Sequence, residues 1–448
     1  MTRSHSRGGL ATAAPLVAAL LVAALTTGCT GPTAEPDPTN LPGPARSDAR
    51  QGAPSSTVPS GPGASSGSAS PRSPAASATA SPTANPTANP TANPTAGPTT
   101  RPGGEPVPGA PDLTVLADWT LREKVGQLVM VGLPVGGPFQ PTLTMLREKQ
   151  IGGVFLHGRT TAGRQPVKNL VAAAVDAAAA DKVPLFVATD QEGGAVQVLR
   201  GPGFSDIPSA LDQAELTPAE LRSRSRAWGD ELAAAGVNLN LAPVLDLVPR
   251  ATASSNAPIG AFGRNYGYTA RSVVEHGNAF VRGQSDADVQ TSIKHFPGLG
   301  RVTGNTDDTS GVTDTVTGAD APSVTVFEAG VEAGSGLVMM SSAVYTEIDP
   351  KNPAVFSPVV VGLVRELGFD GVVISDDLSA AAQVQDVPAG RRAVRAVDAG
   401  VDLVLASARP SVAPAMVDAL LRAARDDPDF AAKVDAAAAR VVTAKAAL

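Results

Sequence analysis

The sequence has few of the residues that would indicate several common protein classes. Only one of its 448 residues is a cysteine, which excludes a disulfide within the chain. It has four histidines, and their spacing is too wide to predict a zinc site, so we expect no metal. Residues 113–448 carry a net formal charge of −8 at pH 7, whereas nucleic-acid-binding domains are normally positive. We therefore expect no nucleic-acid partner.

Aromatic residues and lysine are missing from a long N-terminal stretch. Residues 30–112 contain 19 of the 40 prolines and no Phe, Trp, Tyr or Lys, so these 83 residues cannot build a hydrophobic core. A tandem Pro-Thr-Ala-Asn repeat occupies residues 82–93, and segments of this kind stay extended and solvated. We predict a disordered linker here, which is either a tether or a spacer of no functional length.

The first 29 residues have the features of a secretory leader. Arg3 and Arg7 precede an apolar run over residues 10–25, and small residues then lead to Cys29. A transmembrane helix is the alternative, but the run is shorter than the roughly 20 residues that a span requires. The motif before Cys29 resembles a bacterial lipobox, which implies lipidation of this thiol and an extracytoplasmic, membrane-anchored protein. Simple secretion is the alternative.

Residues 113–448 alternate between short apolar runs and alanine-rich helical stretches, as expected for βα units. The predicted strands are residues 128–133, 153–157, 184–190, 237–246, 290–295, 337–342, 371–376 and 401–406. Eight such units predict an α/β fold, namely a (β/α)8 TIM-type barrel. A doubly wound open sheet is the alternative, but the phosphate-binding glycine pattern that it usually carries is absent from the sequence.

Polar residues follow four of the predicted strands at their C-terminal ends. These are Asp190, Asp246, Lys294 with His295, and Asp376. A barrel places its active site at this face, so we expect these side chains to converge. The alternative for each aspartate alone is a cap on the next helix.

Four motifs resemble those of the family 3 glycoside hydrolases. They are DQEGG at residues 190–194, NLAPVLD at residues 240–246, KHFPGLG at residues 294–300 and GFDGVVISDDL at residues 368–378. With no second domain after the barrel, residues 113–448 resemble the single-domain β-N-acetylhexosaminidases of that family. The resemblance implies a retaining mechanism through a covalent glycosyl-enzyme, with Asp376 as the nucleophile. Asp377 should leave the strand on the opposite side and face the helices or cap the next one.

The resemblance also implies a set of sugar-binding residues, namely Asp190, Arg264, Lys294 and His295. Asp246 is a weaker member of this set, since it can equally brace the loop that carries Arg264. In the family, DQEGG usually continues as Arg-Val-x-Arg. This chain has AVQV at residues 195–198 and retains only Arg200 just beyond, which we include as a binding residue.

The proton donor departs from the family pattern. The related hexosaminidases carry a histidine in the loop after the fifth strand, but no histidine occurs after His295 in this chain. Asp307 and Asp308 are the only acids in the corresponding loop, residues 301–311, and burial beside the Asp376 charge would allow either to hold a proton. We slightly favour Asp308. The alternative is that both only shape the turn.

The sequence therefore predicts an exported enzyme that removes β-linked N-acetylglucosamine from cell-wall glycans, with retention. We expect a monomer that needs no cofactor. Two alternatives remain open at this stage. The missing histidine is also compatible with a barrel that binds sugars or a partner without efficient turnover, and the fold is equally compatible with a β-glucosidase-type exo-glycosidase.

Overall fold

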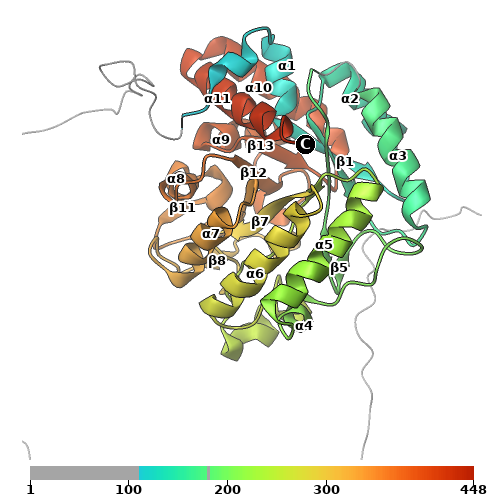
Figure 1. The fold of residues 1–448 in the computed structure, drawn as a ribbon. Coiled ribbons are helices and arrows are strands. Elements are labelled where there is room, and N and C mark those ends of the chain that lie inside the picture. Colours follow the sequence, from blue (N-terminus) through green and yellow to red (C-terminus); the bar gives the residue numbers. More distant parts are fainter. Residues whose placement is uncertain (1–109, 179–181) are drawn as a thin grey trace, which may run out of the picture. The chain divides into compact units, whose positions relative to one another are not determined.

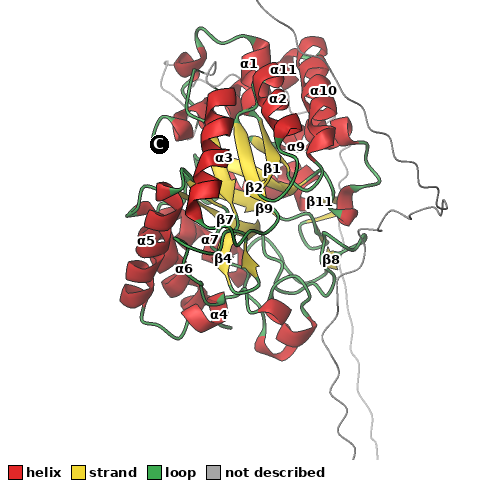
Figure 2. Ribbon diagram, turned by 90° about the vertical axis from the view of Figure 1, so that its right-hand side faces the viewer, coloured by secondary structure: helices red, strands yellow, loops and turns green. Residues whose placement is uncertain are grey.

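The computed structural model describes residues 110–178 and 182–448. The predicted leader with Cys29, and nearly all of the predicted linker, lie outside these residues. Eight parallel strands close into a barrel in the order β1-β13-β12-β9-β7-β6-β3-β2. Figure 2 shows these strands at the centre of the fold with helices around them. The predicted (β/α)8 barrel is confirmed.

Among the described residues, eight strands form the barrel and five further strands lie in the loops. The barrel strands are β1 (Val129–Pro134), β2 (Gly153–His157), β3 (Phe186–Thr189), β6 (Leu239–Asn240), β7 (Gln290–Phe296), β9 (Leu337–Met340), β12 (Val372–Asp377) and β13 (Leu403–Ala406). The loop strands are β4 (Gln191–Gly193), β5 (Val196–Gln197), β8 (Thr313–Asp314), β10 (Val344–Tyr345) and β11 (Asp349–Pro353).

The helices follow the strands in the order that a βα barrel requires (Figure 1). They are α1 (Leu121–Gln127), α2 (Gln140–Lys149), α3 (Arg164–Ala177), α4 (Ala210–Gln213), α5 (Pro218–Ala234), α6 (Ala270–Ser285), α7 (Pro322–Glu332), α8 (Pro358–Glu366), α9 (Ala389–Ala399), α10 (Ala413–Asp426) and α11 (Pro428–Lys445). Over residues 110–178 and 182–448, none of the helices has the length and apolar character needed to cross a membrane.

Local sequence signals explain where the helices begin. The N-terminus of α5 is a capping box, in which Thr217 accepts a hydrogen bond from the Glu220 amide and the Glu220 carboxylate accepts one from the Thr217 amide. Pro218 occupies the first helical position, where a missing N–H costs nothing. α9 ends at Gly400, whose φ of 108° suits glycine.

Apart from a small cluster around Trp228 of α5 and Phe280 of α6, the hydrophobic core has two layers. The larger lies between the strands and the surrounding helices, and the smaller fills the barrel with side chains such as Phe186, Leu239 and Ile374. Val441 of α11 belongs to the inner cluster, so the C-terminal helix packs against the barrel interior. The barrel interior is therefore filled by side chains, as is usual for this fold.

The fourth barrel strand is shorter than predicted. Only Leu239–Asn240 pair as a regular strand, and a single bridge from Val244 to Lys294 continues the contact with β7. Pro243 lies between these two points and has no N–H to donate to a ladder. Proline therefore explains why the regular pairing stops before the predicted end at residue 246.

Two barrel strands contain an irregularity at their polar ends. Ile293 and Phe296 of β7 are three positions apart, but their partners in β9 are only two positions apart. Likewise, β12 has one residue more than β13 between the pairs that Ile374 and Asp377 form. On β12, the Ser375 hydroxyl accepts a hydrogen bond from the Leu405 amide. Bulges of this kind redirect side chains, so neighbouring residues can point to the same side.

Candidate active site

A cavity of about 390 Å³ opens at the carboxyl ends of the barrel strands, which is a volume at the small end for small-molecule pockets. Its charged lining consists of Asp190, Arg264, Lys294, His295, Asp307, Asp308, Asp376 and Asp377. Below these lie apolar side chains of the barrel interior, including Phe155, Leu241 and Met339. The cavity therefore rests directly on the core and combines an apolar base with charged walls.

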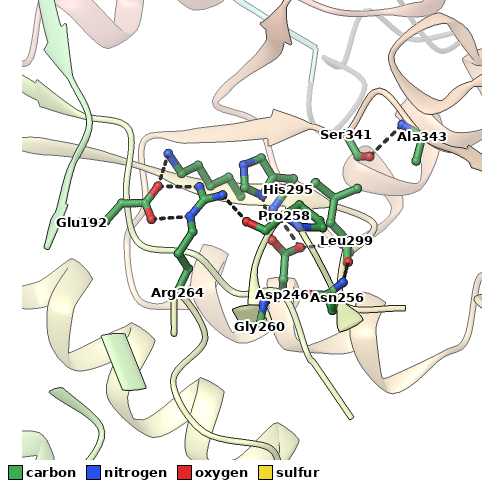
Figure 3. A network of polar contacts seen from close by, with 12 residues as sticks. Glu192, Asp246, Asn256, Pro258, Gly260, Arg264, His295, Leu299, Ser341 and Ala343 are labelled. Atoms are coloured by element: carbon green, nitrogen blue, oxygen red, sulfur yellow. Dashed lines mark hydrogen bonds and ion pairs between the residues drawn. The ribbon is translucent and has the colours of Figure 1, made fainter. Parts of the chain in front are cut away.

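Glu192, in the short strand β4, is the centre of a buried ionic cluster. Its carboxylate accepts hydrogen bonds from Arg264 Nη2 at 2.7 Å and Arg264 Nε at 2.8 Å, and Lys294 Nζ lies 2.7 Å from its Oε1. Lys294 Nζ also donates to Asp190 Oδ1 at 2.6 Å. In Figure 3 the side chains of Glu192 and Arg264 point toward one another. The carboxylates of Asp190 and Glu192 therefore balance the charges of Arg264 and Lys294.

This cluster keeps its members ionised. Burial alone would raise the pKa of Glu192, but the charges of Arg264 and Lys294 outweigh burial and lower the pKa to about 2. Burial alone would lower the pKa of Lys294, but Asp190 and Glu192 raise it above its ordinary value. The cavity wall therefore presents fixed charges at neutral pH, which is the condition for binding polar groups without reorganisation.

His295 is held from behind by Asp246. The Asp246 carboxylate lies 2.7 Å from His295 Nδ1 and also accepts a hydrogen bond from the Leu299 amide at 2.7 Å. Figure 3 shows Asp246 next to His295 and Leu299. This arrangement fixes the imidazole ring and leaves its other nitrogen for the cavity side.

Asp376 lies at the irregular end of β12, where the bulge brings it to the cavity. Its Oδ1 accepts a hydrogen bond from the Asp377 amide at 2.8 Å. Burial raises the pKa of Asp376, and the nearby His295 acts in the opposite direction.

Asp307 is the second carboxyl of interest in the cavity. Asp307 lines the cavity from the loop after β7, and the residue as a whole is exposed. Loss of hydration and the negative charge of Asp376 raise the pKa of Asp307 to about 7. The Asp376 charge therefore helps Asp307 to keep a proton.

The cavity therefore combines two carboxyl groups, one of which has its pKa raised to about 7, and a wall of fixed charges. Such a pair can attack an electrophilic carbon from one side and protonate a leaving oxygen from the other. Residues 120–444 match the glycosyl hydrolase family 3 N-terminal domain. The chain belongs to glycosyl hydrolase family 3. It is therefore a glycoside hydrolase.

Similar proteins within family 3 are named as hexosaminidases. The β-hexosaminidase of Stenotrophomonas maltophilia (strain K279a) is 36% identical over 270 residues, covering 58% of this chain and 77% of that protein. The solved β-N-acetylhexosaminidase from Beutenbergia cavernae DSM 12333 shares 54% identity at a TM-score of 0.72, covering 74% of this chain and 99% of that chain. A family 3 β-N-acetylglucosaminidase from Paenibacillus sp. str. FPU-7 shares 31% identity at a TM-score of 0.65, covering 73% of this chain and 62% of that chain.

The family 3 barrel brings most of the residues singled out in the sequence to one cavity. The predicted site residues that line it are Asp190, Arg264, Lys294, His295, Asp307, Asp308 and Asp376. They come from the ends of three strands and from the loops after β6 and β7, as expected if the polar strand ends share one face of the barrel.

Two predicted sugar-binding residues do not reach this cavity. Asp246 is fully buried, and its carboxylate serves His295 and the loop after β7 rather than the loop that carries Arg264. Arg200 donates to Asp206 Oδ1 and to the Gly194 carbonyl oxygen, each at 2.8 Å, and is not part of the cavity lining. Neither residue lines the cavity, and a direct contact of either with a bound sugar stays a prediction.

The prediction that Asp377 faces the helices or caps the next one is wrong. Strand alternation places it on the helix side, but Asp377 lines the cavity like its neighbour Asp376 because the bulge in β12 interrupts the alternation. Its carboxylate accepts hydrogen bonds from the amides of Ser379, Ser407 and Ala408, so it connects the ends of β12 and β13 rather than capping a helix.

Sequence reasoning missed Glu192 although the residue stands inside the DQEGG motif. Arg264 and Lys294 were both expected to bind sugar directly. Two such cations near each other require a buried anion between them, and this requirement could have indicated Glu192. Asn256 was also missed. Its amide nitrogen donates to the carbonyl oxygens of Leu299 and Val302, which ties the loop after β6 to the loop after β7.

A larger cavity of about 600 Å³ lies at the opposite end of the barrel, where β7 begins at Gln290 and Gly371 precedes β12. It is the more apolar of the two cavities. Barrel enzymes place their chemistry at the carboxyl ends of the strands. The smaller, charged cavity is therefore the candidate active site.

Proposed function

We propose that this protein is a retaining exo-β-N-acetylglucosaminidase that hydrolyses O-glycosidic bonds in cell-wall glycans derived from peptidoglycan. The observation that carries the proposal is the pair of carboxyl groups, Asp376 and Asp307, which line one charged cavity of about 390 Å³. Loss of hydration and the Asp376 charge, which raise the pKa of Asp307 to about 7, support it. A cavity of this size suits one terminal sugar. The names of its family 3 relatives support a 2-acetamido sugar as that unit.

In the first step, an Asp376 oxygen attacks the anomeric carbon while Asp307 gives its proton to the glycosidic oxygen. The bond between carbon and leaving oxygen breaks, and the sugar becomes an ester of Asp376. In the second step, Asp307 takes a proton from water, whose oxygen attacks the same carbon and releases Asp376. Two displacements at one carbon retain its configuration.

Asp307 rather than Asp308 is assigned as the proton donor, which reverses the slight preference drawn from the sequence. The Asp308 carboxylate accepts a hydrogen bond from Asn305 Nδ2 at 3.1 Å, within its own loop. Asp307 instead has the pKa that general acid catalysis near neutral pH requires, since burial and the Asp376 charge favour its protonated form.

Asp190, Arg264, Lys294 and His295 are assigned to the hydroxyl groups of the terminal sugar. Each of them lines the cavity, and Glu192 and Asp246 hold three of them in place through hydrogen bonds. Charged partners in fixed positions favour one orientation of a polyhydroxylated ring.

The proposed location rests on the sequence before residue 110, which lies outside the described residues. A lipid attached to Cys29 and a linker over residues 30–112 would hold the barrel outside the cytoplasm beside the cell wall. Incorporation of labelled fatty acid into the wild-type protein, and its loss in Cys29→Ser, would test this anchor. Equal labelling of both proteins would refute it.

Turnover of 4-nitrophenyl β-N-acetylglucosaminide by the purified protein tests the activity. This leaving group needs little protonation, so the assay reports on Asp376, and Asp376→Ala should abolish turnover. The β-configured anomer should be the first product detected by proton NMR. Faster turnover of the corresponding glucoside would contradict the N-acetyl specificity, and unchanged turnover in Asp376→Ala would contradict the nucleophile.

A further inference from the structure

Gln383 joins the two segments that carry the proposed catalytic carboxyls. It lies in a short 3-10 helix, Ala382–Val384, in the segment after β12. Its side-chain oxygen accepts a hydrogen bond from the Val312 amide at 2.9 Å, and its side-chain nitrogen donates to the Val312 carbonyl oxygen at 3.1 Å. Val312 directly follows the 301–311 loop that contains Asp307.

Backbone hydrogen bonds continue this connection to Asp307 itself. The Ala382 amide donates to the Asp307 carbonyl oxygen at 2.9 Å, and the Gln383 amide donates to the Thr306 carbonyl oxygen at 3.1 Å. Within residues 110–178 and 182–448, no hydrogen bond to the Asp307 carboxyl is found. The position of this carboxyl therefore depends on where its backbone is held.

We propose that Gln383 is a positioning residue, which holds the 301–311 loop so that Asp307 stays beside Asp376. This inference rests on the proposed function, because it gives a role to the loop only if Asp307 is the proton donor. Gln383 is not part of the cavity lining, so it acts through the loop and does not touch the sugar.

The chemistry of the contact requires an amide side chain. One residue's backbone offers an N–H and a C=O, and the amide of Gln or Asn pairs with both at once because it has a separate acceptor oxygen and donor nitrogen. Glutamate at this position would set a carboxylate against the Val312 carbonyl oxygen, and alanine would leave both backbone groups without these partners.

The start of the loop is held in a similar way by Asn256, which donates to the carbonyl oxygens of Leu299 and Val302. The Asn256 side chain also accepts a hydrogen bond from Gly260, in the segment that leads to Arg264. Replacement of Asn256 would therefore disturb the sugar-binding wall as well, whereas Gln383 gives a cleaner test of loop position.

The test compares Gln383→Ala with Gln385→Ala in the full chain. Gln385 is a matched control because it is the same residue type two positions on, and its side chain donates to the carbonyl oxygens of Ser379 and Ala381 rather than to the loop. For each protein, kcat/KM is measured on 4-nitrophenyl β-N-acetylglucosaminide and on a methyl β-N-acetylglucosaminide, whose leaving group depends on the donor.

For Gln383→Ala, kcat/KM on the methyl glycoside should fall by about tenfold or more, with a change of less than about threefold on the nitrophenyl glycoside. The basic limb of the pH profile should move to lower pH, because Asp307 loses the surroundings that raise its pKa. Gln385→Ala should show neither effect. In an Asp307→Asn background, Gln383→Ala should cause no further loss on the methyl glycoside.

Equal losses on both substrates with an unmoved pH limb would show a merely structural role and overturn the positioning role. An unchanged exchange rate of the Val312 amide with solvent deuterium in Gln383→Ala would overturn the contact itself. If the wild-type protein hydrolysed neither substrate, the proposed function would fail and the positioning role with it. If the wild type were active and Asp307→Asn had no selective effect, only the donor assignment and the positioning role would fail.

Discussion

Replacing Glu192 with glutamine should destabilise the barrel strongly, because Glu192 is the anion that separates two buried cations. Its carboxylate accepts two hydrogen bonds from Arg264 and lies 2.7 Å from Lys294 Nζ, and its side chain is only 5% exposed. Glutamine keeps the shape and removes the charge. Taking away one partner of a buried ion pair typically costs about 3–5 kcal/mol, since the other charge stays buried without compensation.

The pKa of Glu192 gives an independent magnitude. Its value of about 2 in the folded protein, against an ordinary 4.5, corresponds to about 3 kcal/mol of folding free energy. Because the folded-state pKa is depressed, this stabilisation is complete above about pH 5 and is lost as the pH falls toward 2. We therefore expect Glu192→Gln to lower the free energy of unfolding by about 3 kcal/mol at pH 7 and by only about 1 kcal/mol at pH 3.

Urea unfolding of the purified proteins, followed by circular dichroism at both pH values, measures these differences. Glu275→Gln is the matched control, since Glu275 pairs with Arg271 on an exposed helix surface at 2.8 Å. Glu275→Gln should change the free energy of unfolding by no more than about 0.5 kcal/mol. Wild-type stability in Glu192→Gln at pH 7, or a deficit that grows on acidification, would refute the assignment of Glu192 as the ionised centre of the cluster.

Three further substitutions test the proposed donor Asp307 and the two residues outside the cavity lining, Asp246 and Arg200. On a methyl glycoside, wild-type kcat/KM should fall as the pH rises through about 7, because the proposed donor Asp307 loses its proton there. A pH series should show that Asp307→Asn lacks this limb. Asp246→Asn should lower kcat/KM about 10- to 100-fold in steady-state assays, since a charged hydrogen bond to His295 is worth about 1.5–3 kcal/mol. Arg200→Ala should change kcat/KM by less than about twofold, and a tenfold loss would contradict its position outside the cavity.

The fold was predictable because its signals are local. Each strand is a short apolar run and is followed by a helical stretch. Eight repeats of that pattern are compatible with few folds. The same reasoning located the site, since Asp190, Lys294 and Asp376 stand at strand ends and the barrel brings those ends together. Neither step required knowledge of which distant residues touch.

The pairings inside the site could not be predicted in this way. Glu192 and Arg264 are 72 residues apart, and Asp246 and His295 are 49 apart, so neither pair leaves a trace in hydrophobic periodicity. The orientation of Asp377 failed for a related reason. Alternation assumes a regular strand, and the bulge in β12 depends on pairing with β13, which belongs to another part of the sequence.

The identity of the proton donor connects the loop to the chemistry. An imidazole has a pKa near neutrality without help, so a loop histidine can hold a proton at neutral pH without a surrounding that raises its pKa. A solvated aspartate has a pKa of about 4 and would be ionised at neutral pH. Asp307 can therefore act as donor only while the cavity wall and the Asp376 charge raise its pKa to about 7. A carboxyl in place of the family's histidine thus requires a loop that is held in place, and the hydrogen bonds from Gln383 to Val312 supply that restraint.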